Sequence, residues 1–541
     1  MPYIPTKDSP YAFTYYQDGG KPVSNPTYRA LDTNLITDLT TLSNIIGGGL
    51  WVRYQFRWRN YETNPTGGAV SEPPTNTPIY WDGPSGNTDP TKSAVQTMDN
   101  AVAAFNAANI NVMLTIQDAP DNYLIFDDSG TNVGLGSGTL GGPQAYSRFA
   151  QHLATRYDGN HGHGHVESIQ IGNEEFDTVS GRTGRALGPT ANAAIPAVRA
   201  INPALLMGIC SVRKTPTNSS THISNWCQNV FSVITAANFP DFVDAHCYYD
   251  GRLSPDPTST VDTTGVAIAP ELTLIGNALQ SYAPTGQKNT PIYVLETGWN
   301  VGDVVCNPTS LVQTTLSGTI SATQATPFTL NVASGVGFPT SGNDFYLIVK
   351  NEWMHCSTRS GTAFTIDQRN IEKDVSTSAN LTHANGETVQ WAVMITDGTT
   401  DAKHQSRAPY LTDMFDALRT QNPNPVGKLG IWTIDYQKPL QAASVSPSLG
   451  TGTGSSWKAI TDYMTAHPSW TSATLNTLQT NARSIFNIRA QARTNTRSTF
   501  FITPSNVNAN LYYKTMPLSA SDGNLPMTAS DGNLPMKEAN P

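Results

Sequence analysis

Two glutamates stand at the ends of short apolar runs and could together do acid, base or nucleophilic chemistry. PIYVLETGWN, residues 291 to 300, delivers Glu296, and IQIGNEEFD, residues 169 to 177, delivers Glu174 directly after Asn173. Cleavage of a glycosidic bond needs two such groups, because one carboxylate attacks while a carboxylic acid protonates the leaving oxygen. The pair therefore indicates chemistry on glycosides.

The elements that would position these groups are strands of a parallel sheet. An apolar run of four to eight residues bounded by Pro or Gly is typical of a core strand, and catalytic groups of α/β folds lie where such strands end. Similar runs predict strands at residues 11–19, 50–58, 110–120, 204–212, 241–249 and 428–437. Helical spacing predicts helices at 31–46, 95–105, 146–157, 189–201, 223–236, 403–420 and 457–467.

The order of these motifs resembles that of the clan A glycoside hydrolases. The resemblance rests on Asn173 and Glu174 at one strand end, Glu296 at another, and His-Cys-Tyr at residues 246 to 248 between them. It implies an α/β fold, a (β/α)8 TIM barrel, with Glu174 as acid/base on strand four and Glu296 as nucleophile on strand seven. The implied reaction is a double displacement that retains anomeric configuration.

Glu175 competes with Glu174 for the acid/base role. Adjacent residues on a strand point to opposite faces, so only one of the two can enter the site. The Asn-Glu pattern of the resemblance favours Glu174, and geometry alone does not decide between them.

Three further residues match the resemblance around the nucleophile. The clan places an Arg on strand two against the nucleophile, and Arg53 matches it; the alternative is a core Arg in a salt bridge, since a buried Arg must be paired. His246 and Tyr248 are two apart, so both face one side of their strand. The resemblance implies that Tyr248 contacts the nucleophile and that His246 lines the sugar pocket, whereas a core His and a surface Tyr are the alternative.

Flat aromatic faces and polar groups would complete the substrate site. Sugar rings stack on faces of the kind that Trp58, Trp299 and Trp432 offer, and Trp432 matches the Trp that the clan carries on strand eight. Asp118 ends the third strand and is predicted to bind substrate. Asn173 is expected to hold a sugar hydroxyl near the reacting carbon.

Two other motifs suggest cofactors or metals, and neither has the required context. GSGTLG at residues 136 to 141 matches a dinucleotide fingerprint, but about twenty residues separate it from the preceding strand instead of none. HGHGH at residues 161 to 165 joins a helix to the following strand, which places it opposite the catalytic ends of a barrel. We expect plain loops at both places, and no cofactor or metal.

Composition and charge exclude several classes. The chain of 541 residues carries a formal charge of −9, which argues against nucleic acid as a partner, whereas a neutral oligo- or polysaccharide demands no charge. Its 5 cysteines have no metal-site spacing and form no disulfide framework. No apolar run reaches the roughly 18 residues of a membrane span, and no export signal is visible, so we expect a soluble chain without a membrane partner. An extracellular or virion-associated location stays open.

The chain is too long for a barrel of about 250 residues alone. Residues 302 to 400 alternate with period two between Gly, Ser and Asn turns, which predicts an all-β insertion between strand seven and helix seven. The expected division is a barrel over 1–301 and 401–470, an inserted domain over 302–400, and a C-terminal extension over 471–541 in which ASDGNLPM occurs twice. The insertion resembles small β modules of bacteriophage virion proteins, which implies assembly on a virion or surface.

The sequence therefore predicts a retaining glycoside hydrolase acting on β-linked glycans. A non-catalytic carbohydrate-binding protein, or a virion or tail structural protein on a glycosidase-like barrel, is the alternative. A metal-dependent hydrolase is weaker, because His246 is the one histidine at a predicted strand end.

Overall fold

The computed structural model describes the chain from Ser9 to residue 469 in segments. The described residues are 9–16, 31, 33–63, 69–80, 94–120, 122–126, 132–135, 140–173, 186–210, 220–246, 268–297, 304–306, 312–340, 342–350, 352–371, 380–419, 426–431 and 451–469. The predicted C-terminal extension at 471–541 lies outside them. Within the described segments, no helix is both long and apolar enough to cross a membrane.

Eight parallel strands close into a barrel, which confirms the predicted fold class. In the order in which they pair, the strands are β1 (Tyr11–Tyr16), β2 (Trp51–Arg57), β5 (Asn111–Gln117), β8 (Ser168–Ile171), β9 (Leu206–Ile209), β10 (Phe242–His246), β11 (Ile292–Glu296) and β20 (Val426–Ile431). β20 pairs with β1 and completes the ring. Because all strands run the same way, their carboxyl ends meet at one edge, where catalytic groups of such barrels lie.

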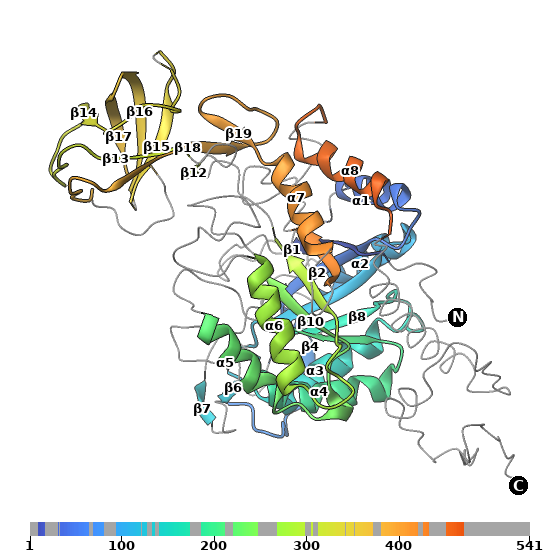
Figure 1. The fold of residues 1–541 in the computed structure, drawn as a ribbon. Helices are drawn as coiled ribbons and strands as arrows, with labels where there is room; N and C mark the ends of the chain where they lie inside the picture. The colour runs from blue at the N-terminus through green and yellow to red at the C-terminus, as the bar shows by residue number, and fades with distance from the viewer. Residues whose placement is uncertain are drawn as a thin grey trace, which may run out of the picture.

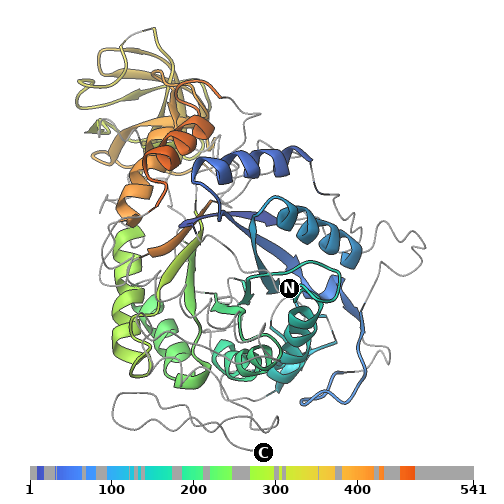
Figure 2. The ribbon, with the colours of Figure 1, turned by 90° about the vertical axis from the view of Figure 1, so that its right-hand side faces the viewer.

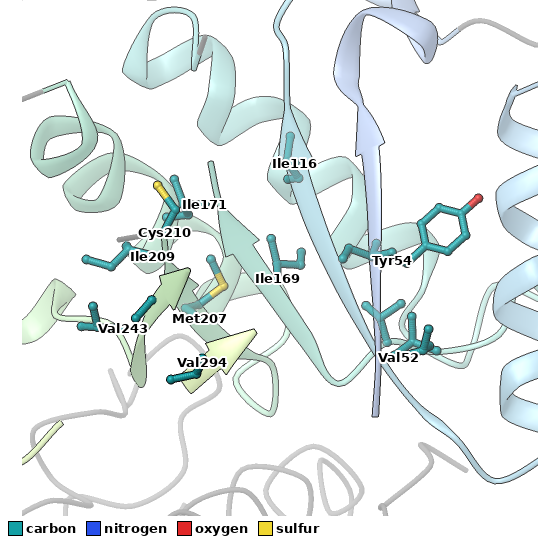
Figure 3. Packing of buried hydrophobic residues seen from close by; sticks show 14 of the residues in the cluster. Val52, Tyr54, Ile116, Ile169, Ile171, Met207, Ile209, Cys210, Val243 and Val294 are labelled. Atoms are coloured by element: carbon teal, nitrogen blue, oxygen red, sulfur yellow. The ribbon is translucent and has the colours of Figure 1, made fainter. Parts of the chain in front are cut away.

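Helices surround the barrel (Figures 1 and 2). They are α1 (Thr33–Ile45), α2 (Ala94–Ala107), α3 (Pro143–Arg156), α4 (Leu187–Ile201), α5 (Ser220–Phe231), α6 (Ile268–Tyr282), α7 (Ala408–Arg419) and α8 (Ser456–Ala466). Helix α6 was not predicted, although Leu272, Ile275 and Leu279 lie at helical spacing and are buried. The outward side chains of the strands join the helices in one apolar cluster, of which Figure 3 shows members on neighbouring strands.

The barrel interior changes from apolar to polar along the strands. A buried apolar layer includes Ala12, Trp51, Met113, Leu206 and Phe242. Two positions further along, on the same inward face, stand the polar side chains of Thr14, Arg53, Thr115 and Asp244. Polar side chains in a closed interior must bond to one another, so this second layer is a candidate for function rather than for packing.

The β insertion follows β11 and ends before α7. Its strands are β12 (Val304–Cys306), β13 (Gln313–Thr315), β14 (Phe328–Asn331), β15 (Phe345–Val349), β16 (Glu352–Ser360), β17 (Ala363–Arg369), β18 (Thr388–Thr396) and β19 (His404–Ser406). They form one sheet with its own apolar core. Figure 1 shows this sheet standing beside the barrel, beyond α7. The sheet extends to Ser406. We propose that the inserted domain spans residues 302 to 400.

A buried ion pair joins the insertion to the barrel. Asp397 follows β18 and accepts hydrogen bonds from the backbone of Ser456, at 2.6 Å, and from Arg407, at 3.1 Å. Arg407 also donates to the Ser456 hydroxyl at 2.7 Å and is 1% exposed. Because Ser456 begins α8, the end of β18 is attached directly to a helix of the barrel.

Two small hairpins extend the loops that follow the carboxyl ends of β2 and β5. β3 (Glu62–Thr63) pairs with β4 (Ile79–Tyr80) after β2, and β6 (Leu124–Phe126) pairs with β7 (Asn132–Leu135) after β5. The two loops also touch, because the backbone of Val70 donates to the carbonyl of Asn122 at 3.1 Å. They form a connected wall on one side of the barrel mouth.

Candidate active site

Glu296 is the last residue of β11 and its side chain is turned into the barrel. It is 3% exposed. One carboxylate oxygen, Oε1, accepts a hydrogen bond from Nη1 of Arg53. The other, Oε2, lies 3.4 Å from Nδ1 of His246. A carboxylate is tolerated at this burial because a guanidinium and an imidazole face its two oxygens.

Arg53 connects β2 with the ends of β8 and β11 through its planar fork. It comes from β2 and is fully buried. Nη1 donates to Glu296, Nη2 donates to Oδ1 of Asn173 at 2.7 Å, and Nε donates to Oε1 of Gln170 at 2.8 Å. Five donors in a rigid plane allow one Arg to hold three acceptors at fixed angles, which Lys cannot do.

Asn173 follows β8 and points toward the same guanidinium. Its Oδ1 accepts from Arg53, so its amide nitrogen keeps its hydrogens for another acceptor. The structure therefore brings the end of β8 and the end of β11 to one cation. The next residue, Glu174, lies outside the described residues, as do Glu175, Tyr248, Trp299 and Trp432.

Asp244 is a site residue that sequence analysis missed. It is fully buried on β10, two positions before His246 and on the same inward face. Its Oδ2 lies 2.8 Å from Nε2 of His246 and 3.7 Å from Nη2 of Arg53. The spacing Asp-x-His at a strand end was the available signal, because residues two apart on a strand share a face.

The charges of this cluster can balance. His246 has a carboxylate oxygen near each ring nitrogen, Asp244 on one side and Glu296 on the other. Both nitrogens can donate only in the imidazolium form. In that form, the two cations Arg53 and His246 offset the two carboxylates, which lowers the cost of keeping all four out of water.

Uncharged side chains complete the polar layer. Gln170 donates through Nε2 to Asp244, and its Oε1 accepts from Thr115 at 2.9 Å as well as from Arg53. Gln55 donates to Gln117 at 3.0 Å nearer the mouth. These amides orient the charged groups, because each has a fixed donor and acceptor side.

Asp118 lies at the carboxyl-terminal edge of the barrel strands, directly after β5, and its carboxylate is close to two arginines. Its Oδ2 is 3.1 Å from Nε of Arg57 and 3.4 Å from Nη2 of Arg59. Its φ of 52° is in the left-handed region, which Asp adopts more readily than most residues. The side chain is 22% exposed, so it borders the mouth, and its role in substrate binding stays a proposal.

The prediction that Trp58 offers a face to a sugar is wrong. Trp58 is fully buried, stacks on Phe149 with centroids 5.0 Å apart, and has Tyr123 and Tyr146 edge-on. Its Nε1 donates to Glu62 at 2.7 Å. Burial raises the pKa of the Glu62 carboxyl, against the lowering effect of its hydrogen bonds from Tyr123 and Trp58. Trp58 therefore stabilises the loops after β2 and β5 by packing inside them.

The three histidines of residues 161 to 165 lie beside three different carboxylates. His161 lies 3.0 Å from Asp158, His163 lies 3.1 Å from Asp99, and His165 lies 3.0 Å from Glu167. Across the described part of the chain, no group of three His, Cys, Asp or Glu side chains is arranged to hold a metal ion. Each of these histidines therefore has a different carboxylate as its neighbour.

No protein-family model matches the sequence, and no curated protein sequence does. Solved structures with some likeness include a glucosidase from Croceicoccus marinus, at 16% identity and a TM-score of 0.33 over 55% of this chain and 53% of that one. The chain thus spans about half of that glucosidase.

Two other solved structures are similar over more of this chain. A GH113 beta-1,4-mannanase matches at 10% identity and a TM-score of 0.38, over 84% of this chain and 99% of its own. A beta-galactosidase from Marinomonas ef1 matches at 10% identity and a TM-score of 0.37, over 89% and 61%. At these values the likenesses decide nothing about activity, which we infer from the residues in the barrel mouth.

Proposed function

We propose that this protein is a retaining glycoside hydrolase acting on β-linked oligo- or polysaccharides. Glu296 is the nucleophile and Glu174 the acid/base. The observation that supports this best is the guanidinium of Arg53, which donates both to Glu296 at the end of β11 and to Asn173, the neighbour of Glu174, at the end of β8. A carboxylate held in this way at a barrel mouth is suited to attack rather than to proton transfer.

The proposed reaction has two displacements. A carboxylate oxygen of Glu296 bonds to the anomeric carbon while the bond to the leaving oxygen breaks and Glu174 gives that oxygen its proton. Glu174, now a carboxylate, then takes a proton from a water molecule. The oxygen of that water bonds to the anomeric carbon as the ester to Glu296 breaks. Arg53 and His246 contact the carboxylate of Glu296 before the first step and again after the second step has regenerated it.

Two mutations test the assignment. Glu296→Gln and Glu174→Gln should each fold normally and lower kcat by about 10³-fold or more, since each removes a separate step. Glu175→Gln is the matched control and should have a small effect. A panel of β-linked glucan, mannan, xylan and 4-nitrophenyl β-glycosides supplies the substrate. Near-normal turnover by Glu296→Gln would end the assignment.

Stereochemistry tests the mechanism independently. Retaining enzymes have carboxyl groups about 5 to 5.5 Å apart, which leaves no room for water, whereas inverting enzymes keep about 6.5 to 9.5 Å. Proton NMR of the first product from a β-linked substrate should show the β anomer before mutarotation. The α anomer appearing first would refute attack by Glu296.

The alternative is a barrel that binds glycans without cleaving them, with the β insertion serving attachment to a virion or surface. Its support is that the insertion has its own sheet and core. Glycan binding by isothermal titration calorimetry, with no product released from any member of the panel, would favour this alternative.

A further inference from the structure

The direction of Glu296 depends on an irregularity in β11. Tyr293 and Leu295 belong to the apolar cluster inside the barrel, whereas Val294 belongs to the cluster between strands and helices. Regular alternation would therefore turn Glu296 outward, toward the helices. The pairing with β10 instead skips Leu295, so that Glu296 returns to the inward face. Such irregularities re-aim side chains next to active sites.

Leu295 is held by side chains at both polar atoms of its backbone. Its N–H donates to Oδ1 of Asp244 at 3.1 Å, and its carbonyl accepts from Oγ1 of Thr14 at 3.0 Å. Thr14 comes from β1 and Asp244 from β10, and they are 1% and 0% exposed. Two fixed elements on either side of β11 thus hold the residue that precedes the nucleophile.

We propose that Thr14 and Asp244 are positioning residues that aim Glu296 through the backbone of Leu295. The inference rests on the proposed function of Glu296. Asp244 acts on the same carboxylate from a second direction, because it also holds Nε2 of His246, whose Nδ1 faces Glu296. Thr14 donates a hydrogen bond to the Leu295 carbonyl, so variants of its hydroxyl test this backbone contact directly.

Thr14 allows a matched pair of variants. Thr14→Val keeps the shape and removes the hydroxyl that bonds the Leu295 carbonyl, whereas Thr14→Ser keeps the hydroxyl. A displacement of about 1 Å at a reacting group can cost about 100-fold in rate. We expect kcat of Thr14→Val to fall about 10- to 100-fold with KM within about 3-fold of wild type, and Thr14→Ser to stay within about 3-fold in both.

Asp241, which lies directly before β10, supplies the control for Asp244. Asp244→Asn should lower kcat about 100-fold, because the amide must present a donor where His246 and Gln170 now find an oxygen. Asp241 precedes β10, accepts from the backbone of Met207 at 2.8 Å and pairs with Arg199 at 3.2 Å. Asp241→Asn should lower the unfolding temperature and leave kcat unchanged.

The assay must distinguish a misplaced Glu296 carboxylate from a smaller fraction of folded protein. The substrate is the 4-nitrophenyl β-glycoside that wild type cleaves fastest. The matching 2-deoxy-2-fluoro glycoside traps active chains covalently, and mass spectrometry counts the trapped fraction. The hydrolysis rate of each variant is divided by this fraction. The inference holds if kcat per trapped site falls in Thr14→Val and recovers in Thr14→Ser. Equal kcat per trapped site in wild type and Thr14→Val would overturn it.

Glu296→Gln, measured in parallel, distinguishes the two levels of inference. Activity retained by Glu296→Gln means that the proposed function is wrong. An inactive Glu296→Gln beside a fully active Thr14→Val means that only the positioning role is wrong. If Asp244→Asn does not fold, the two Thr14 variants decide alone.

Discussion

Arg53 and Glu296 stand 243 residues apart in the sequence and form an ion pair inside the barrel. Their side chains are 0% and 4% exposed. They come from β2 and β11, which are separated around the barrel by β1 and β20. Each charge offsets the other in the buried cluster that also contains Asp244 and His246, which lowers the cost of keeping both out of water.

The first prediction concerns the fork of Arg53. Arg53→Lys keeps the charge but cannot bond Glu296, Asn173 and Gln170 together, so we expect kcat to fall at least about 100-fold. Arg199→Lys is the control, because Arg199 also bonds three groups, Ala237, Phe239 and Asp241, but away from the polar layer. It should lower the melting temperature and leave kcat intact. Wild-type kcat in Arg53→Lys would contradict the role of the fork.

The second prediction tests the burial of Trp58. Trp58→Phe keeps the stack on Phe149 and removes the donor to Glu62, so the free energy of unfolding should fall by about 1 to 3 kcal/mol. KM should not change, because no face of Trp58 reaches the mouth. Trp299→Phe and Trp432→Phe are the contrast, since we propose that these two stack on sugar. Urea unfolding and steady-state kinetics measure both effects, and a raised KM in Trp58→Phe would restore the stacking role.

The third prediction concerns acid sensitivity of the β insertion. Glu352 is buried and bonds to His383 at 2.8 Å and to Arg369 at 2.7 Å. Burial opposes ionisation of Glu352, but the hydrogen bonds outweigh it and hold the pKa of its carboxyl below the ordinary value of 4.5. A carboxyl whose pKa is lower in the folded chain adds stability above its unfolded value and loses it as the pH falls through the folded one.

We therefore expect the insertion to become less stable as the pH falls from about 5 to about 3. Glu352→Gln should be less stable at neutral pH and show a flatter dependence across this window, because it has no proton to bind. Scanning calorimetry of the full chain at each pH measures this. Parallel pH dependences for wild type and Glu352→Gln would contradict the assignment.

The fourth prediction is that the insertion can be removed. Its larger apolar cluster lies between Leu316 and Val389, a smaller one includes Val304 and Ala392, and Cys306 of β12 pairs with Ala392 of β18 in antiparallel register. Replacing residues 307 to 391 by Asn-Gly closes this stem with a two-residue hairpin turn. The barrel should fold and cleave a small aryl glycoside within about 3-fold of the parent.

The ion pair at the base of the insertion supplies the control for this excision. Asp397 remains in the shortened chain, so adding Asp397→Asn should lower its melting temperature by a few degrees through loss of the bonds to Arg407 and Ser456. An insoluble excision variant would show that the insertion is part of the core.

Much of the barrel could be predicted from the sequence because its strands are short apolar runs that end in polar residues. Glu296 was singled out because it ends such a run, whereas Arg53 and His246 were singled out by the resemblance to the clan A glycoside hydrolases; the structure brings the three side chains together inside the barrel. The insertion was visible because period-two alternation replaces helical spacing there. Three-residue strands such as β12, β13 and β19 carry too little pattern to be recognised.

Other features were decided only by the tertiary structure. Asp244 and Thr14 are single polar residues within apolar strands, and their partners come from strands distant in the sequence. Trp58 stands at the end of a strand, as a sugar-stacking residue would, but Phe149, Tyr123 and Glu62 enclose it. A side chain's type states what it can bond, whereas its neighbours determine which bonds it makes.

The direction of the Glu296 side chain shows most clearly which features follow from the sequence and which from the tertiary structure. The sequence by itself determined that a carboxylate ends an apolar strand. Alternation from Tyr293 and Leu295 would turn that carboxylate toward the helices, and the skipped pairing of β11 with β10 turns it into the barrel instead. At that irregularity, Asp244 and Thr14 bond to the backbone of Leu295 from two other strands, and such contacts form only when the barrel closes.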